Sequence, residues 1–276
     1  MNTSTPRNKT KLACTIASQT TANAPVLLGG DLEQSIKTAS ALGYDAVELH
    51  WADPQQIDLD RLQQFCDHYR INVSAFATGR AYVQEGLSLI HEDRSLRQKA
   101  IRRLTDFIDA AVPFQATVII GCIRGNLAPD DDPNQMMERL AESTHKVATY
   151  AAEQNVSIVF EAINRYENNY LNTASETLGF IRNNQFPHTK LLLDTFHMNI
   201  EDPGIEQAIL DSGELLGYVH FADSNRRYVG AGHIDFNKIM EALKIIGYEG
   251  CVSAECLPLP SSFIAAKKWI DGVRKL

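Results

Sequence analysis

The run Val156-Ser157-Ile158-Val159-Phe160-Glu161 is typical of a strand that is buried on both faces, as in a parallel sheet, and it ends in a carboxylate. Three later apolar runs have the same form, and they end at Asp194, His220 and Glu255. A charged or imidazole side chain at the end of a buried strand is costly unless something there binds it. The repetition therefore predicts that these four strand ends meet around one common ligand.

Strand-like runs alternate with helix-like segments along the whole chain. Helix boundaries are marked by capping residues, such as Asp31 before one predicted helix and Gly43 after it. The predicted strands cover 12–17, 46–49, 72–77 and 116–122 and then the four runs above, and the predicted helices cover 31–42, 58–69, 93–111, 132 to at least 151, 173–183, 203–212, 235–246 and 262–275. Eight such alternations over about 250 residues predict an α/β fold, a single (β/α)₈ TIM barrel.

An open, doubly wound sheet is the alternative fold. It usually carries a glycine-rich nucleotide turn after its first strand, and Gly29-Gly30 lies too far along and lacks the required spacing. No linker or charge run divides the chain. We therefore predict one catalytic domain over residues 11–276, preceded by a disordered tail over residues 1–10.

Composition narrows the classes of partner. The chain has 276 residues with a formal net charge of −8, which argues against nucleic-acid binding because that function needs a basic face. No apolar stretch approaches the ~20 residues of a membrane helix, so no membrane partner is expected. The five cysteines are scattered without a C-x-x-C pair, which favours reduced thiols and a cytoplasmic location.

A closed barrel would bring Glu161, Asp194, His220 and Glu255 to one rim, on neighbouring strands about 4.8 Å apart. Three carboxylates and one imidazole form a mostly hard, oxygen-rich ligand set. This set predicts a divalent metal, with Mn²⁺ first and Mg²⁺ or Co²⁺ as alternatives. Each residue taken alone could equally be an ordinary salt-bridged strand end, so the prediction depends on all four occurring in phase.

The segments around these residues resemble the ketose 3-epimerases (D-tagatose and D-psicose 3-epimerases) of the xylose isomerase-like barrel superfamily. The resemblance covers residues 156–256 most strongly. It is carried by EAINRYENNYLNT at 161–173, DTFHMNIE at 194–201, HFADSNRR at 220–227 followed by Gly230 and His233, and SAE at 253–255.

The resemblance implies that Glu161, Asp194, His220 and Glu255 bind the metal and that Glu161 and Glu255 are also the catalytic proton-transfer pair. It implies substrate contacts for Glu167, His197 and Arg226. The reaction implied is inversion of the carbon next to a ketone (C3 of a keto-sugar) by deprotonation and reprotonation through an enediolate. It also implies an isomerase-class enzyme (EC 5.1.3-type) of carbohydrate metabolism, in a homodimer or homotetramer.

Two features depart from the pattern of the neutral-ketose enzymes. Phe-Ala-Asp223 follows His220 where those enzymes usually carry a Gly-Glu-type pair, and the loops at 78–88 and 121–125 look more like those of relatives acting on keto-sugar acids or phosphates. Arg80 and Arg124 would end two neighbouring strands on the metal side of the barrel and could bind an anionic group. We therefore predict Arg124 as a further substrate-binding residue and keep a keto-sugar acid or sugar phosphate as an alternative substrate.

Three further functions stay open at this point. An aldose–ketose isomerase of the hydroxypyruvate isomerase type uses nearly the same groups on a different carbon. An endonuclease IV-type DNA-repair enzyme shares the barrel, but it needs more histidine ligands and a basic surface. A sugar-binding barrel without turnover is disfavoured by the presence of both Glu161 and Glu255.

Overall fold

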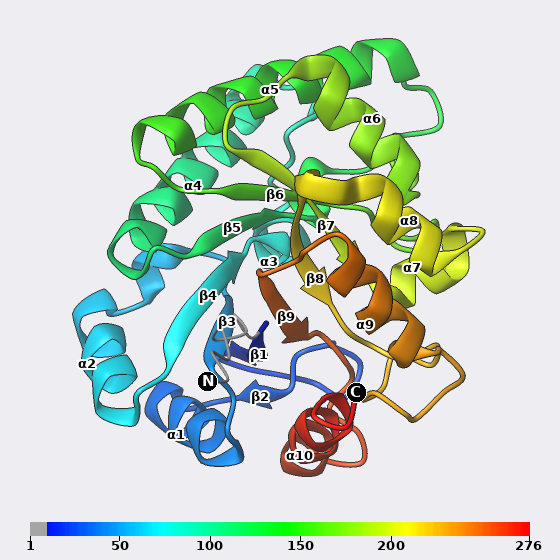
Figure 1. Ribbon diagram of the computed structural model, residues 1–276. Helices are drawn as coiled ribbons and strands as arrows, with labels where there is room; N and C mark the ends of the chain where they lie inside the picture. Colours follow the sequence, from blue (N-terminus) through cyan, green and yellow to red (C-terminus); the bar gives the residue numbers. More distant parts are fainter. Residues whose placement is uncertain (1–9) are drawn as a thin grey trace, which may run out of the picture.

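The computed structural model describes residues 10–276 and forms one closed parallel barrel. Eight strands follow one another around the barrel in chain order, and the last pairs with the first (Figure 1). The barrel strands are β1 (Lys11–Ala17), β3 (Ala46–His50), β4 (Asn72–Ala77), β5 (Thr117–Ile120), β6 (Ile158–Glu161), β7 (Thr189–Asp194), β8 (Leu216–His220) and β9 (Cys251–Ala254), and the two-residue β2 (Leu28–Gly29) lies beside β1. The predicted (β/α)₈ TIM barrel is confirmed.

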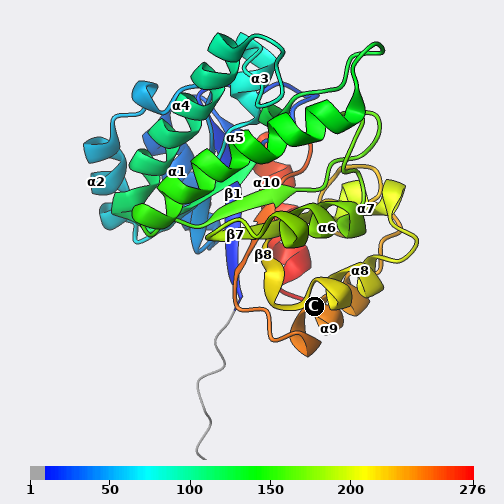
Figure 2. The ribbon, with the colours of Figure 1, turned by 90° about the horizontal axis from the view of Figure 1, so that it is seen from above.

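Helices cover the outside of the barrel, and the long α4 and α5 lie side by side in both views (Figures 1 and 2), with α4 packed against β5. The α-helices are α1 (Leu32–Leu42), α2 (Leu59–Tyr69), α3 (Gly79–Glu85), α4 (Arg94–Ala111), α5 (Pro133–Glu153), α6 (Ala174–Asn184), α7 (Thr195–Glu201), α8 (Ile205–Ser212), α9 (Phe236–Ile245) and α10 (Ser262–Val273). Short 3₁₀ turns are η1 (Pro54–Gln56), η2 (Val112–Phe114), η3 (Cys122–Arg124) and η4 (Gly213–Leu215).

The capping residues read from the sequence act as expected. The Asp31 side chain accepts a hydrogen bond from the Gln34 backbone N–H at 2.8 Å, and Gly43 ends α1 in the left-handed conformation with φ of 90°. Two short helices, α3 and α7, were not predicted. Both follow directly after a strand, where they are too short to show a helical period in the sequence.

The barrel interior is filled by small residues on one side and larger ones on the other. Ala13, Ala46 and Ala75 come from β1, β3 and β4, and they face larger side chains such as Leu192 and Tyr218. The Tyr218 hydroxyl reaches across the barrel and forms a 2.8 Å hydrogen bond with Ser74. Packing therefore closes the barrel below its carboxyl-terminal rim.

The strand register places the predicted ligands at similar heights. Asp194 on β7 is paired with His220 on β8, and His220 is paired with Ser253 on β9, two residues before Glu255. Because all strands run parallel, these residues lie at the same rim, where the active sites of such barrels are found. The N-terminal segment predicted as a disordered tail lies outside the described residues except for Thr10. Among the described helices, none has the length and apolar character needed to cross a membrane.

Candidate metal centre and active site

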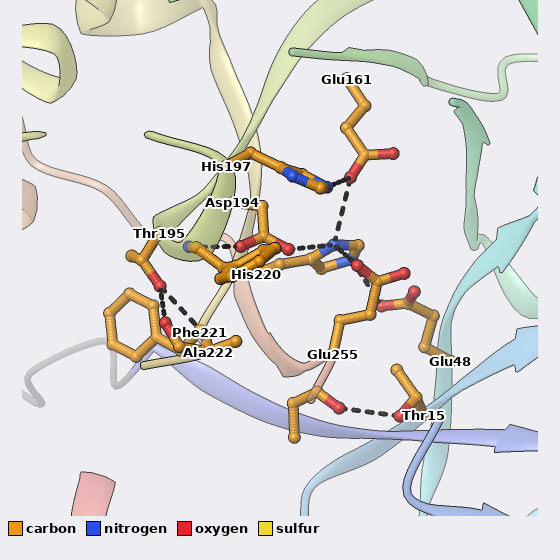
Figure 3. A network of polar contacts seen from close by, with 12 residues as sticks. Thr15, Glu48, Glu161, Asp194, Thr195, His197, His220, Phe221, Ala222 and Glu255 are labelled. Atoms are coloured by element: carbon orange, nitrogen blue, oxygen red, sulfur yellow. Dashed lines mark hydrogen bonds and ion pairs between the residues drawn. The ribbon is translucent and has the colours of Figure 1, made fainter. Parts of the chain in front are cut away.

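The four predicted metal ligands converge at the carboxyl-terminal rim (Figure 3). His220 Nδ1 lies 3.3 Å from Glu255 Oε2, 3.7 Å from Glu161 Oε1 and 3.9 Å from Asp194 Oδ2. All four residues are buried, and Asp194 is fully so. His220 Nδ1 thus lies within 3.9 Å of all three carboxylates, and ligand atoms of these carboxylates and of His197 lie within 4.8 Å of one another.

The hydrogen bonding of the cluster fits a bound cation. Asp194 Oδ1 caps helix α7 by accepting from the Phe196 N–H at 2.7 Å, whereas Oδ2 is buried and has no hydrogen-bond partner. His220 Nδ1 is likewise buried without a hydrogen-bond partner. Buried polar atoms left in this state are costly unless a ligand binds them. An oxygen-rich set of this kind suits a hard divalent cation.

The backbone around the rim is held by two buried threonine hydroxyls (Figure 3). Thr195 Oγ1 donates to the Ala222 carbonyl at 2.6 Å and accepts from the Ala222 N–H at 3.0 Å, which ties the end of β7 to the segment after β8. Thr15 Oγ1 donates to the Ala254 carbonyl at 2.7 Å, directly before Glu255. These clamps fix the strand ends from which the ligands project.

The two glutamates predicted as proton-transfer groups have opposite electrostatic environments. Burial raises the pKa of Glu161, and the nearby charge of Glu255 raises it further. Burial acts on Glu255 in the same direction, but the nearby charge of His220 outweighs it and lowers the pKa of Glu255 to about 2. Pairs of carboxyl groups whose pKa values are driven apart are typical of acid–base catalysis.

Glu48 belongs to the site and was missed in the sequence. This residue of β3 is fully buried, and its carboxylate contacts His220 Nε2 at 3.1 Å and His50 Nε2 at 2.8 Å. The available signal was a charged residue within the otherwise apolar Ala46–His50 strand. That signal was weaker than those of the strand ends, because a charged residue inside a short strand can also face solvent.

The three predicted substrate contacts lie beside the cluster and line one cavity with it. His197 Nε2 is 3.8 Å from Glu161 Oε1, and its Nδ1 contacts the Asn164 amide at 2.6 Å. Burial lowers the pKa of His197, and Arg226 lowers it further, so the imidazole is neutral. Glu167 forms an ion pair with Arg226, whose guanidinium also lies 4.8 Å from the centre of the Phe196 ring.

Asp223 explains how Arg226 is held. The Asp223 carboxylate accepts hydrogen bonds from the backbone N–H groups of Ser224, Gly230 and Ile234 and so folds the loop after β8. Arg226 sits in this loop with a positive φ of 56° and donates its backbone N–H to the Asp223 carbonyl. The residue that departs from the epimerase pattern therefore shapes the loop and does not line the cavity.

The cavity has a volume of about 420 Å³ and spans the barrel mouth. One wall carries Glu161, Glu167, His197, His220, Arg226 and Glu255. The other wall is formed by His50, by the segment after β1 and by the first turns of α3, with Arg80. A cavity of this size is ordinary for a small-molecule site.

Arg124 is a correction to the predicted substrate contacts. Its side chain is fully buried and does not line the cavity. The guanidinium donates to the Glu161 carbonyl at 2.6 Å, to Asn168 Oδ1 at 3.1 Å and to the Tyr170 carbonyl at 3.2 Å. A guanidinium has five N–H donors in a rigid plane, so it can donate to several backbone carbonyls at once. Arg124 therefore braces the segment that begins at Glu161 and does not line the cavity.

Comparison with known proteins assigns the family. The family model for the xylose isomerase-like TIM barrel matches residues 36–273. The chain belongs to this family.

Similar curated proteins include L-ribulose 3-epimerase of Methylomonas sp. strain DH-1, which is 33% identical over 80% of this chain and 77% of its own length. D-psicose 3-epimerase of Ruminiclostridium cellulolyticum is 32% identical over 82% of this chain and 78% of its own. The crystal structure of D-allulose 3-epimerase from Methylomonas sp. in complex with D-allulose shares the fold, with a TM-score of 0.82, 24% identity and 96% of each chain covered. The predicted resemblance to ketose 3-epimerases and the isomerase class are confirmed.

The bracing role of Arg124 yields a first prediction. Arg124→Met should destabilise the protein by about 3 kcal/mol, because several buried acceptors lose their donor at once. Thermal or urea unfolding measures this loss. In the folded fraction, KM for a neutral ketose and for a keto-sugar acid should change by the same factor. If KM rose only for the keto-sugar acid, Arg124 would instead be a contact for the anionic group of the substrate.

Proposed function

We propose that this protein is a divalent-metal-dependent epimerase that inverts the carbon next to the ketone of a keto-sugar. The observation that carries the proposal is the convergence of Glu161, Asp194, His220 and Glu255 on one buried point, with unpartnered ligand atoms on Asp194 and His220. Glu161 and Glu255 are the outer members of this arc of four strands, so they flank the position that a substrate in the cavity would take.

The metal, most suitably Mn²⁺, with Mg²⁺ and Co²⁺ as alternatives, would be held by these four residues and would stabilise negative charge developing on the substrate oxygens. The protein groups supply the proton transfers. One glutamate takes the proton from the carbon next to the carbonyl, and the other returns a proton to the opposite face, which inverts the centre.

Glu167, His197 and Arg226 are proposed to orient the sugar. His197 is neutral, with Nδ1 engaged by Asn164, and its Nε2 lies near Glu161 Oε1 beside the reacting position. Arg226 is fixed by Glu167 and by the Phe196 ring, so its guanidinium can hold a hydroxyl or carbonyl oxygen at little entropic cost. L-ribulose and D-psicose, named for the relatives, are the first substrates to test.

A second candidate substrate class, a keto-sugar acid or phosphate, is favoured by Arg80. Its guanidinium lines the cavity on the wall opposite β8 and donates to the Gln19 backbone carbonyl at 2.6 Å. Burial lowers the pKa of Arg80, and no carboxylate within 4.0 Å balances its charge among the described residues. A partly desolvated cation in a cavity wall is suited to bind an anionic group at the far end of the substrate.

We propose a cytoplasmic location from the state of the cysteines. The five cysteines are free, and four of them are buried, which suits a reducing cytoplasm. The homodimer or homotetramer stays a prediction from the resemblance, and the expected partner is a small keto-sugar or sugar acid, without nucleic acid or membrane.

The paired glutamates give the second prediction. Glu161→Gln and Glu255→Gln should each lower kcat by at least about 10³-fold while the circular dichroism spectrum is retained, because each removes one proton-transfer group. Turnover is followed on D-psicose and L-ribulose with added Mn²⁺, together with the incorporation of solvent deuterium at C3.

Glu138→Gln on the outer face of α5 is the matched control and should behave as the original protein, since Glu138 does not line the cavity. Removal of metal with a chelator should abolish turnover, and Mn²⁺ should restore it. Near-normal rates in both glutamine variants would contradict the two-base scheme.

Arg80 gives the third prediction. Arg80→Gln should raise KM for a ketohexonate by about tenfold, the loss expected for one charge-assisted hydrogen bond, and change KM for a neutral ketohexose by less than about threefold. Arg102→Gln, on the exposed surface of α4, serves as the control. Equal effects on both substrates would remove the case for an anionic keto-sugar.

A further inference from the structure

The scheme above leaves one fully buried carboxylate without a function. We propose that Glu48 is a positioning residue that holds His220 with Nδ1 directed at the three carboxylates and thereby raises the affinity of the centre for a divalent cation. The proposal rests on the proposed metal centre and adds a residue to it that does not touch the metal.

The location of Glu48 makes a purely structural role a poor explanation. It lies in the middle of β3, which is buried along its whole length, and its side chain has no exposed surface. A carboxylate removed from water pays a desolvation cost of several kcal/mol, and even a well-paired buried ion contributes little net stability. An apolar residue at this position would serve the barrel at least as well.

The contacts of Glu48 fix the hydrogen on the His220 ring. Glu48 Oε2 lies 3.1 Å from His220 Nε2, and a carboxylate oxygen can only accept, so the hydrogen lies on Nε2. Nδ1 is then the ring atom that can offer its lone pair to a cation, and it is the atom that faces Glu255, Glu161 and Asp194. A histidine held in this way by a carboxylate is a stronger and better oriented metal ligand.

Two further contacts prevent this arrangement from rotating. Glu48 Oε1 is engaged by His50 Nε2 at 2.8 Å, so both carboxylate oxygens are occupied and the group cannot turn about its axis. The Tyr218 ring packs against the His220 ring at 90° with the centres 5.6 Å apart, and its hydroxyl is bonded to Ser74. Contacts within the protein therefore fix both the plane of the His220 ring and the nitrogen that is left to bind a cation.

The test is the Mn²⁺ dissociation constant, measured by titration of the whole protein with free Mn²⁺ detected by electron paramagnetic resonance. Glu48→Ala should weaken Mn²⁺ binding by 10- to 100-fold, the usual effect of losing a partner of a metal ligand. The Mn²⁺ dissociation constant of Glu48→Gln should lie between those of the original protein and of Glu48→Ala, because the amide oxygen still accepts a hydrogen bond from Nε2 but carries no charge. Ser143→Ala removes a buried hydrogen bond from α5 to the Leu89 carbonyl, away from the centre, and it should bind Mn²⁺ as the original protein does.

Melting temperatures of the metal-free proteins separate positioning from general loosening. If Glu48 were only structural, its variants would melt earlier but bind Mn²⁺ normally once folded, and that result overturns the proposal. The nearly isosteric Glu48→Gln keeps the test decisive if Glu48→Ala does not fold. Failure of the unaltered protein to bind Mn²⁺ would instead contradict the metal centre itself, and the role of Glu48 with it.

Discussion

Uncompensated negative charge at the barrel rim is the constraint on which the site depends. Three carboxylates, from Glu161, Asp194 and Glu255, are buried within a few ångströms of one nitrogen, and such a group is unstable unless a positive charge lies among them. The carboxylates of Glu48 and Glu255 raise the pKa of His220 although burial opposes this, which shows how strongly the pocket attracts positive charge. A divalent cation would balance the charge of these carboxylates and would also stabilise negative charge that develops on a substrate.

These charges lie close together because all strands of the barrel run parallel, so that their carboxyl ends lie at the same rim. Four consecutive strands contribute one proposed ligand each, and the pairing of Asp194 with His220 places these two residues at the same height. Asp194 has both a structural and a proposed chemical role, since one oxygen caps α7 and the other, which has no hydrogen-bond partner, would bind the proposed cation. The wall across the cavity carries Arg80 and His50, and we propose that it selects the substrate.

The parts of this arrangement that repeat along the chain could be predicted from the sequence. Buried strands that end in a ligand, and helices marked by Asp31 and Gly43, follow from periodicity and local capping. The roles of Arg124 and Glu48 depend on contacts with residues 37 and 172 positions away in the chain, and no local pattern contains that information. Arg124 was correctly placed near the site but turns to backbone carbonyls, because buried carbonyls need donors as much as a substrate does.

The most direct test of the central claim is anomalous diffraction from crystals of the protein grown with Mn²⁺, recorded on both sides of the manganese absorption edge. We expect one strong anomalous peak per chain, from an ion bound by carboxylate oxygens of Glu161, Asp194 and Glu255 and by His220 Nδ1. A peak bound elsewhere, or fully occupied crystals in which His220 turns Nδ1 away from the ion, would contradict it.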